Sequence, residues 1–165
     1  MKVSDRFHKG PVQDLLNAVV VQAAEDYREY SAKLLVHPDD QEAAEGKEEV
    51  ESFFLSEDFC FYTKVGGDYI LKKLKEEQKA AVELASEFRE KTGTLVKIWH
   101  DFSAGGFQDT DKLEMADSLI RRVKEIQKKP PTGWKKLFVF KTAEKNAIKK
   151  IERWRKEHER KDEYA

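Results

Sequence analysis

The side chains best suited to chemistry in this chain are four histidines, and their spacing favours no catalytic site. They are His8, His37, His100 and His158. No HxxxH or HExxH pair for a metal ion is present. His37 precedes Asp39 and His100 precedes Asp101, and a carboxylate that orients an imidazole can support proton transfer. Neighbouring positions on a helix do not face each other, so these pairs are more typical of caps or surface clusters.

Acidic side chains crowd one stretch of the sequence. They are Asp39, Asp40, Glu42, Glu45, Glu48, Glu49 and Glu51. Coordination of a divalent cation would require several of these oxygens to converge, whereas acids on one surface helix more often form a solvated face or dock a basic partner. Cys60 has no second cysteine for a disulfide, which suits a reducing cytoplasm. We therefore predict a binding protein with no catalytic residue, cofactor or metal ion.

Charge is distributed unevenly along the chain. Residues 1–120 hold 15 Lys and Arg against 25 Asp and Glu, whereas residues 121–165 hold 16 against 7, so the net charge of -1 is a near-cancellation. Fields of this size steer association with a charged partner or draw two parts of one molecule together. Pairing of the opposite charges between two copies would give a homodimer.

The basic end of the chain interleaves cations with aromatic rings, a mixture that can neutralise phosphates and stack on bases. The candidate nucleic-acid-binding residues are Lys135, Lys136, Lys145, Lys149, Lys150, Arg153, Arg155, Lys156, Trp134 and Trp154. The alternative is that Trp154 belongs to a core-facing stripe framed by the long stems of lysine and arginine. Phe138 and Phe140 are likewise expected in the core.

These residues must be positioned by helices, because apolar residues recur at intervals of three and four and the chain has only 8 Gly and 4 Pro. We predict an all-α fold of five or six helices. An N-terminal antiparallel hairpin covers Val12–Val36 and a second helix that Asp39 or Asp40 caps and that ends near Leu55. Ser56 is expected to cap a short aromatic segment.

A further helix begins after Gly66-Gly67 and is expected to end near Gly93. Residues 94–107 continue a helix or form a brief extended piece. Two more helices follow, the last a basic C-terminal helix from Thr142. The predicted divisions are an acidic helical core at 1–92, a linker or irregular segment at 93–109, and a basic helical region at 110–165.

The segment from Ala18 to about Glu76 resembles a family of small helical proteins encoded by phages and prophages of Gram-positive bacteria. The matching stretches are AVVVQAAEDYREY, HPDD, ESFFLSEDF and GGDYILKKLKEE. The resemblance implies a bacterial cytoplasmic setting and transfers no activity. Within it, Gln22, Asp26, Tyr27 and Arg28 are expected to form a buried hydrogen-bond network that fixes the hairpin, with a polar site as the alternative.

Two functions remain open. The first is a phage-type accessory protein that uses its acidic face to bind a host or phage protein, so that a host defence system is inhibited or a host enzyme is redirected. The second is binding of DNA or RNA by the basic segment in phage replication or transcription control. Binding to a membrane is not expected, because glutamates dilute the basic helix and no apolar run approaches about 20 residues.

Overall fold

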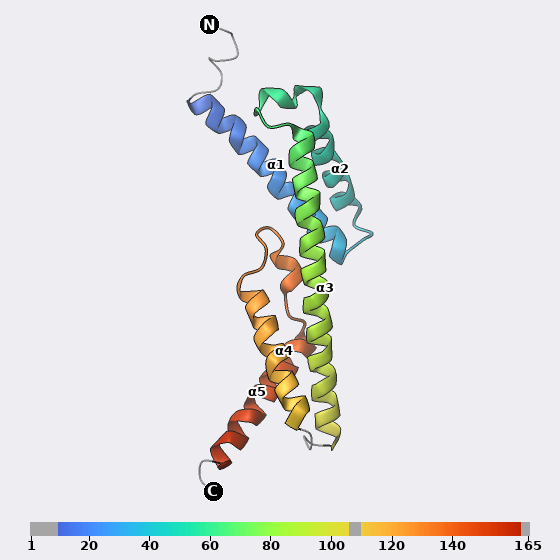
Figure 1. Cartoon of the computed structure of the whole chain (residues 1–165). Coiled ribbons are helices and arrows are strands. Elements are labelled where there is room, and N and C mark those ends of the chain that lie inside the picture. Colours follow the sequence, from blue (N-terminus) through green and yellow to red (C-terminus); the bar gives the residue numbers. More distant parts are fainter. Residues whose placement is uncertain (1–9, 106–109, 163–165) are drawn as a thin grey trace. The chain divides into compact units, whose positions relative to one another are not determined.

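The protein is all-α, as the sequence predicts. The computed structural model describes residues 10–105 and 110–162, with the side chains of residues 10–105 and 111–159, and these residues contain helices and no strand. The elements are α1 (Pro11–Val36), α2 (Gln41–Leu55), η2 (Glu57–Phe61), α3 (Gly67–Gly105), α4 (Thr110–Lys128), η3 (Lys135–Phe138) and α5 (Thr142–Asp162), where η marks a 3-10 helix (Figure 1).

Local chemistry sets the ends of α1 and α2. Pro11 occupies the first helical position of α1, and the backbone N–H of His37 closes its last turn on the carbonyl of Lys33. Asp40 caps α2, because its side chain accepts a 2.9 Å hydrogen bond from the backbone N–H of Ala43. Both boundaries agree with the sequence-based expectation to within one residue.

Ser56 does not act as predicted. It occupies the position before η2, yet its side chain makes no capping bond there. Its hydroxyl instead donates a 2.8 Å hydrogen bond back to the carbonyl of Phe53, at the end of α2. The Ser56 hydroxyl can bond either to the end of α2 or to the start of η2, and it bonds to the Phe53 carbonyl of α2.

The chain divides into two compact units, residues 1–82 with 132–137 and residues 83–131 with 138–165. In the first unit α1 and α2 pack side by side in opposite directions, with Tyr30 of α1 against Gly46 of α2 (Figure 1). One cluster in the core of this unit is formed by five buried residues with further apolar side chains packed around them. The five are Tyr27, Phe54, Phe59, Leu71 and Leu74.

Close packing at the start of α3 requires glycine. A Cβ on Gly67 would lie 1.8 Å from the carbonyl oxygen of Phe54 and 2.9 Å from the ring of Phe59. Both distances are far shorter than a van der Waals contact. The backbone of α3 therefore approaches the end of α2 more closely than any side chain permits.

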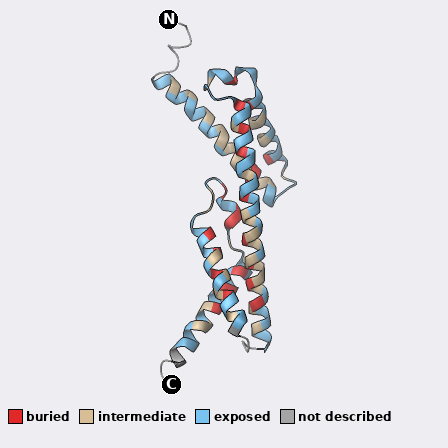
Figure 2. Ribbon diagram, in the orientation of Figure 1, coloured by how far each residue is buried: buried red, intermediate tan, exposed pale blue. Residues whose placement is uncertain are grey.

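The second unit joins residues 83–105 of α3 to α4 and α5. Apolar residues of all three helices (red in Figure 2), together with Phe138 at the end of η3, are fully or nearly fully buried. Among them are Phe88, Leu95, Ile98, Ala116, Ile120, Val123, Ile126, Phe138, Ala147, Ile148 and Ile151. Phe88 also contacts Phe138 edge-on and stacks on Phe140. The expectation that Phe138 is a core residue is correct, whereas Phe140 is half-buried and packs at the border of the core.

The predicted helix end at Gly93 is wrong. α3 runs without interruption to Gly105, so residues 93–105 are not the expected linker, and positions 94–105 take the helical alternative. Leu95 and Ile98 are buried, and this burial outweighs the preference of Gly93 for a helix terminus. The rest of that segment, 106–109, and residues 1–9 and 163–165 of the predicted divisions lie outside the described residues.

Candidate functional site

Among the described residues, the histidines and the cysteine lie apart from one another in the sequence and on or next to different elements. Of the described residues, no group of three His, Cys, Asp or Glu side chains is placed to hold a metal ion. His37 and His100 are exposed, and the ring of His158 stacks on Trp154 with centroids 3.9 Å apart. Cys60 is exposed, with its thiol 3.4 Å from the carbonyl of Glu57. The remaining candidate sites are therefore grooves and charged faces on the surface.

The polar residues of α1 do not form the predicted network within the hairpin. Gln22 and Asp26 pair with each other on the exposed surface at 2.8 Å. The hydroxyl of buried Tyr27 donates to Gln78 of α3 at 3.2 Å. Arg28 makes two hydrogen bonds to the carboxylate of Glu77, also on α3. The hydrogen bonds of Tyr27 and Arg28 therefore join α1 to α3.

An apolar groove that the sequence analysis does not predict lies between α1 and α2. Its volume is about 310 Å³, and its lining consists of Val19, Gln22, Ala23, Asp26, Glu49, Val50 and Phe53. The apolar members form its floor, and Asp26 and Glu49 bring one carboxylate from each helix. A signal for it was present in the sequence, because Val12, Leu15 and Val19 recur at i, i+3 and i+7 on one face.

That face of α1 is not covered within the first unit. Val12 is 56% exposed, Leu15 66% and Val19 38%. The core-facing side of α1 is occupied by Tyr27 and the partly buried Val20. The groove therefore continues as an open apolar strip toward the N-terminal end of α1.

The acidic residues of the predicted partner-binding face divide into different roles. Asp40 is engaged as the cap of α2 and in an ion pair with Lys33 at 3.2 Å. The Ala43 N–H and the Lys33 ammonium hold the pKa of the Asp40 carboxyl below its usual value. Exposed residues of the set are Asp39, Glu42, Glu45, Glu48 and Glu49, and Glu51 is half-buried.

Three of the exposed acids share a stripe on α2. Glu42, Glu45 and Glu49 are spaced i, i+3 and i+7, which places them within about 60° of one another around the helix axis. Glu49 lines the groove, and Glu45 and Glu42 continue the stripe toward the N-terminal end of α2, beyond the residues that line the groove. Glu48 lies about 100° around the helix from Glu49 and outside the stripe.

The structure does not bring the predicted nucleic-acid-binding residues together in one unit. Trp134, Lys135 and Lys136 belong to the first unit, and the residues from Lys145 onward belong to the second. Trp134 is 1% exposed, so its ring cannot stack on a base, and this part of the prediction is wrong. Lys135 is exposed, and the exposed Lys136 pairs with Glu29 at 3.1 Å.

Of the cations on α5, the side chains of Lys145, Lys149, Lys150, Arg153 and Lys156 are exposed. The ammonium of Lys150 lies 5.4 Å from the centre of the Trp99 ring. Arg155 is half-buried and pairs with Asp117 and Glu159. Trp154 is half-buried and packs edge-on against Phe102.

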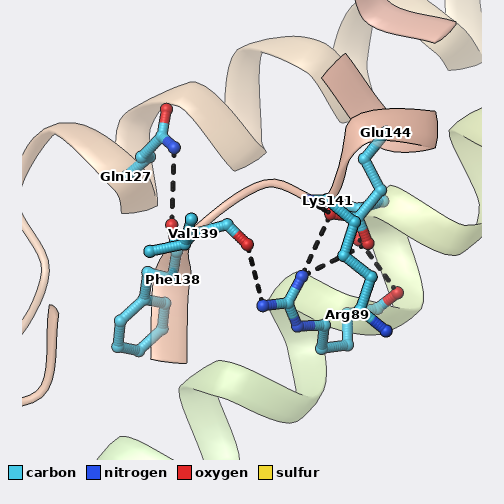
Figure 3. A network of polar contacts seen from close by, with 7 residues as sticks. Arg89, Gln127, Phe138, Val139, Lys141 and Glu144 are labelled. Carbon is cyan, nitrogen blue, oxygen red and sulfur yellow. Dashed lines mark hydrogen bonds and ion pairs between the residues drawn. The ribbon is translucent and has the colours of Figure 1, made fainter. Parts of the chain in front are cut away.

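A polar network anchors the beginning of α5 (Figure 3). The buried carboxylate of Glu144 accepts two hydrogen bonds from Arg89, at 3.0 and 3.3 Å, and one from the hydroxyl of Thr92 at 2.9 Å. It also accepts the backbone N–H of Lys141 at 2.7 Å, as the acid of a capping box does. Arg89 donates a further hydrogen bond to the carbonyl of Val139 at 2.8 Å.

The two units of the folded chain differ less in net charge than the two parts of the sequence do. The first unit holds 13 Lys and Arg against 17 Asp and Glu, and the second 18 against 15, so the units carry only -4 and +3. In the second unit, acids from before residue 121 pair with cations after it. Glu87 binds Arg122, for example, and the paired Arg122 side chain holds the pKa of Glu87 below its usual value. Part of the asymmetry is thus intramolecular attraction.

No protein-family model matches the chain, and no match was found among curated proteins or solved structures. In the part of the chain that the structure describes, no helix is both long and apolar enough to cross a membrane.

Proposed function

We propose that this protein acts without catalysis, by docking a basic amphipathic helix of a protein partner in the groove between α1 and α2. The observation that carries the proposal is the open apolar strip on α1 that leads into a groove edged by carboxylates. A helix that lays its apolar face into such a groove is a common mode of peptide recognition. The partner would place leucine-type side chains on the groove floor.

The dimensions of the apolar strip suit a helical ligand. Val12 and Val19 are seven residues apart, which is about 10 Å along α1, and the groove extends this length toward Val50. Two turns of a partner helix cover about the same distance. Because Val12 and Leu15 are more than half exposed, their contact with a partner would remove apolar surface from water.

The charge around the groove defines the partner's polar face. Residues 39–58 hold nine Asp and Glu against a single Lys. The carboxylates of Asp26 and Glu49 at the groove therefore offer an acidic edge to lysines or arginines that flank an apolar ligand face. Glu42 and Glu45 add acidic charge further along α2. Steering by this edge would raise the association rate, and the rate would fall as salt is added.

The resemblance of residues 18–76 to small phage proteins suggests the biological setting of the proposal. The partner would be a host or phage protein in the bacterial cytoplasm. Covering a basic helix of a defence protein would inhibit it, and covering one on a host enzyme would redirect that enzyme.

The test uses a synthetic helical peptide of about 18 residues, with leucines on one face flanked by lysines, and a control peptide with glutamate in place of lysine. We expect the lysine peptide to bind and to shift NMR resonances of residues that line the groove. The glutamate peptide should bind much more weakly. Absence of binding by the lysine peptide, or shifts confined to residues away from the groove, would contradict the proposal.

Matched variants separate the groove from general charge and apolarity. Leu15→Ser combined with Val19→Ser should weaken the lysine peptide about tenfold or more, whereas Leu35→Ser, at an exposed position off the strip on the same helix, should not. At about 150 mM salt, Glu49→Lys should weaken binding more than Glu48→Lys. Equal effects of the paired variants would show that the groove is not the binding surface.

A further inference from the structure

The exposed side of α5 carries a line of cations. Lys145, Lys149, Arg153 and Lys156 are exposed and spaced so that they fall within about 80° around the helix and about 16 Å along it. We propose that this stripe is a second binding surface of the protein, and that it binds the phosphate backbone of duplex nucleic acid. It is separate from the α1–α2 groove.

The core of the second unit keeps this stripe facing outward. Ala147 and Ile151 are buried on the side of α5 opposite the cations, between about 120° and 180° around the helix from each of them, and Ile148 is buried at the border between the two sides. Bonds from Arg89 to Glu144 hold the first turn. The exposed positions along α5 are pale blue in Figure 2. The stripe is therefore preorganised and requires no folding step before a ligand binds.

Internal ion pairs leave the stripe with a net positive field. The glutamates of α5 nearest to it would otherwise neutralise the cations, but Glu144 is bound by Arg89, Glu152 by Lys124 and Glu159 by Arg155. Glu157 is exposed at the border of the stripe and offsets one charge. None of the four cations forms an ion pair with another described side chain. Their charge is available for phosphates.

The aromatic rings of the second unit favour duplex over single-stranded nucleic acid. Binding of single strands depends on rings that stack on bases. Trp154 is packed against Phe102 and His158, and Trp99 lies beneath the Lys150 ammonium. What α5 presents is a row of cations without an open stacking platform, and such a row neutralises duplex phosphates. The buried apolar side of α5 likewise cannot insert into a lipid surface.

The experiment measures fluorescence anisotropy of a labelled random-sequence DNA duplex with the full-length chain across a salt titration. Four phosphate contacts predict a slope of log affinity against log salt of about -3.6, and roughly a 100-fold loss of affinity between 50 and 200 mM salt. Lys149→Gln combined with Arg153→Gln should reduce the slope to about -1.8. Circular dichroism should show that this variant is as helical as the parent chain.

A matched control removes the same charge elsewhere. Lys75→Gln combined with Lys79→Gln changes two exposed lysines of α3 in the first unit and should leave duplex affinity and slope nearly unchanged. Equal losses in the two variants, tighter binding to a labelled single strand, or binding to anionic phosphatidylserine vesicles without duplex binding would each overturn the proposal. Duplex binding that only the α5 variant weakens would support it.

Discussion

Replacing Gly93 with alanine should stabilise the protein, because Gly93 lies inside α3 and not at a helix end. A Cβ built on Gly93 meets no other atom within 4 Å beyond the local helix backbone. Gly93 does not have a positive φ angle. Among the described residues, only Gly10 and Gly133 have one. Alanine therefore fits the observed backbone without strain.

The expected gain follows from helix propensity. Alanine in a helix interior is more favourable than glycine by about 0.5–1 kcal/mol, because the unfolded chain loses less backbone entropy. For a chain of 165 residues this corresponds to an increase in melting temperature of about 1–4 °C. If Gly93 instead adopted the left-handed conformation of a helix terminus, alanine would destabilise the protein by a similar amount.

Urea unfolding monitored by circular dichroism at the helical minimum measures the difference in the free energy of unfolding between Gly93→Ala and the parent chain. An unchanged m-value shows that the two chains expose the same surface area on unfolding. Gly67→Ala is the control on the same helix. Its Cβ would lie 1.8 Å from the Phe54 carbonyl oxygen, so we expect a loss of about 1–3 kcal/mol or more. A loss of stability in Gly93→Ala would refute the reasoning that α3 continues through this residue.

Three further predictions concern buried or capping groups. Glu144→Gln should lower the free energy of unfolding in urea by about 2 kcal/mol, because Arg89 loses its anionic partner but is already about one-third exposed. A negligible coupling energy in the double-mutant cycle with Arg89→Gln would contradict this. Asp40→Ala should destabilise α2 at neutral pH. Because the Ala43 N–H and Lys33 lower the pKa of Asp40, the difference from the parent should shrink as the pH falls below about 4 and persist above it. Burial raises the pKa of Tyr27, so its contribution is present below pH 10 and lost as the pH rises further. Thermal unfolding between about pH 8 and 11 should show this loss in the parent chain, and a Tyr27→Phe variant with the same pH dependence would argue against it.

Features of the fold that depend on near neighbours along the chain are predictable from residue order alone. The all-α class follows from helical periodicity with few glycines and prolines. The ends of α1 and α2 follow from Pro11 and from the Asp40 side chain, which bonds to a backbone group three residues away. Such interactions span less than two helical turns, so residue order alone reveals them.

Only the tertiary structure decided which side chains are covered. The sequence predicts a helix end at Gly93. Because Leu95 and Ile98 are buried in the second unit, α3 instead continues beyond this residue. Trp134 reads as a base-stacking residue, yet it is buried. The groove between α1 and α2 is lined by residues of both helices, such as Val19 and Phe53, which only the packing of the two helices brings together. Burial and ion pairing depend on residues tens of positions apart, and local periodicity carries no information about those partners.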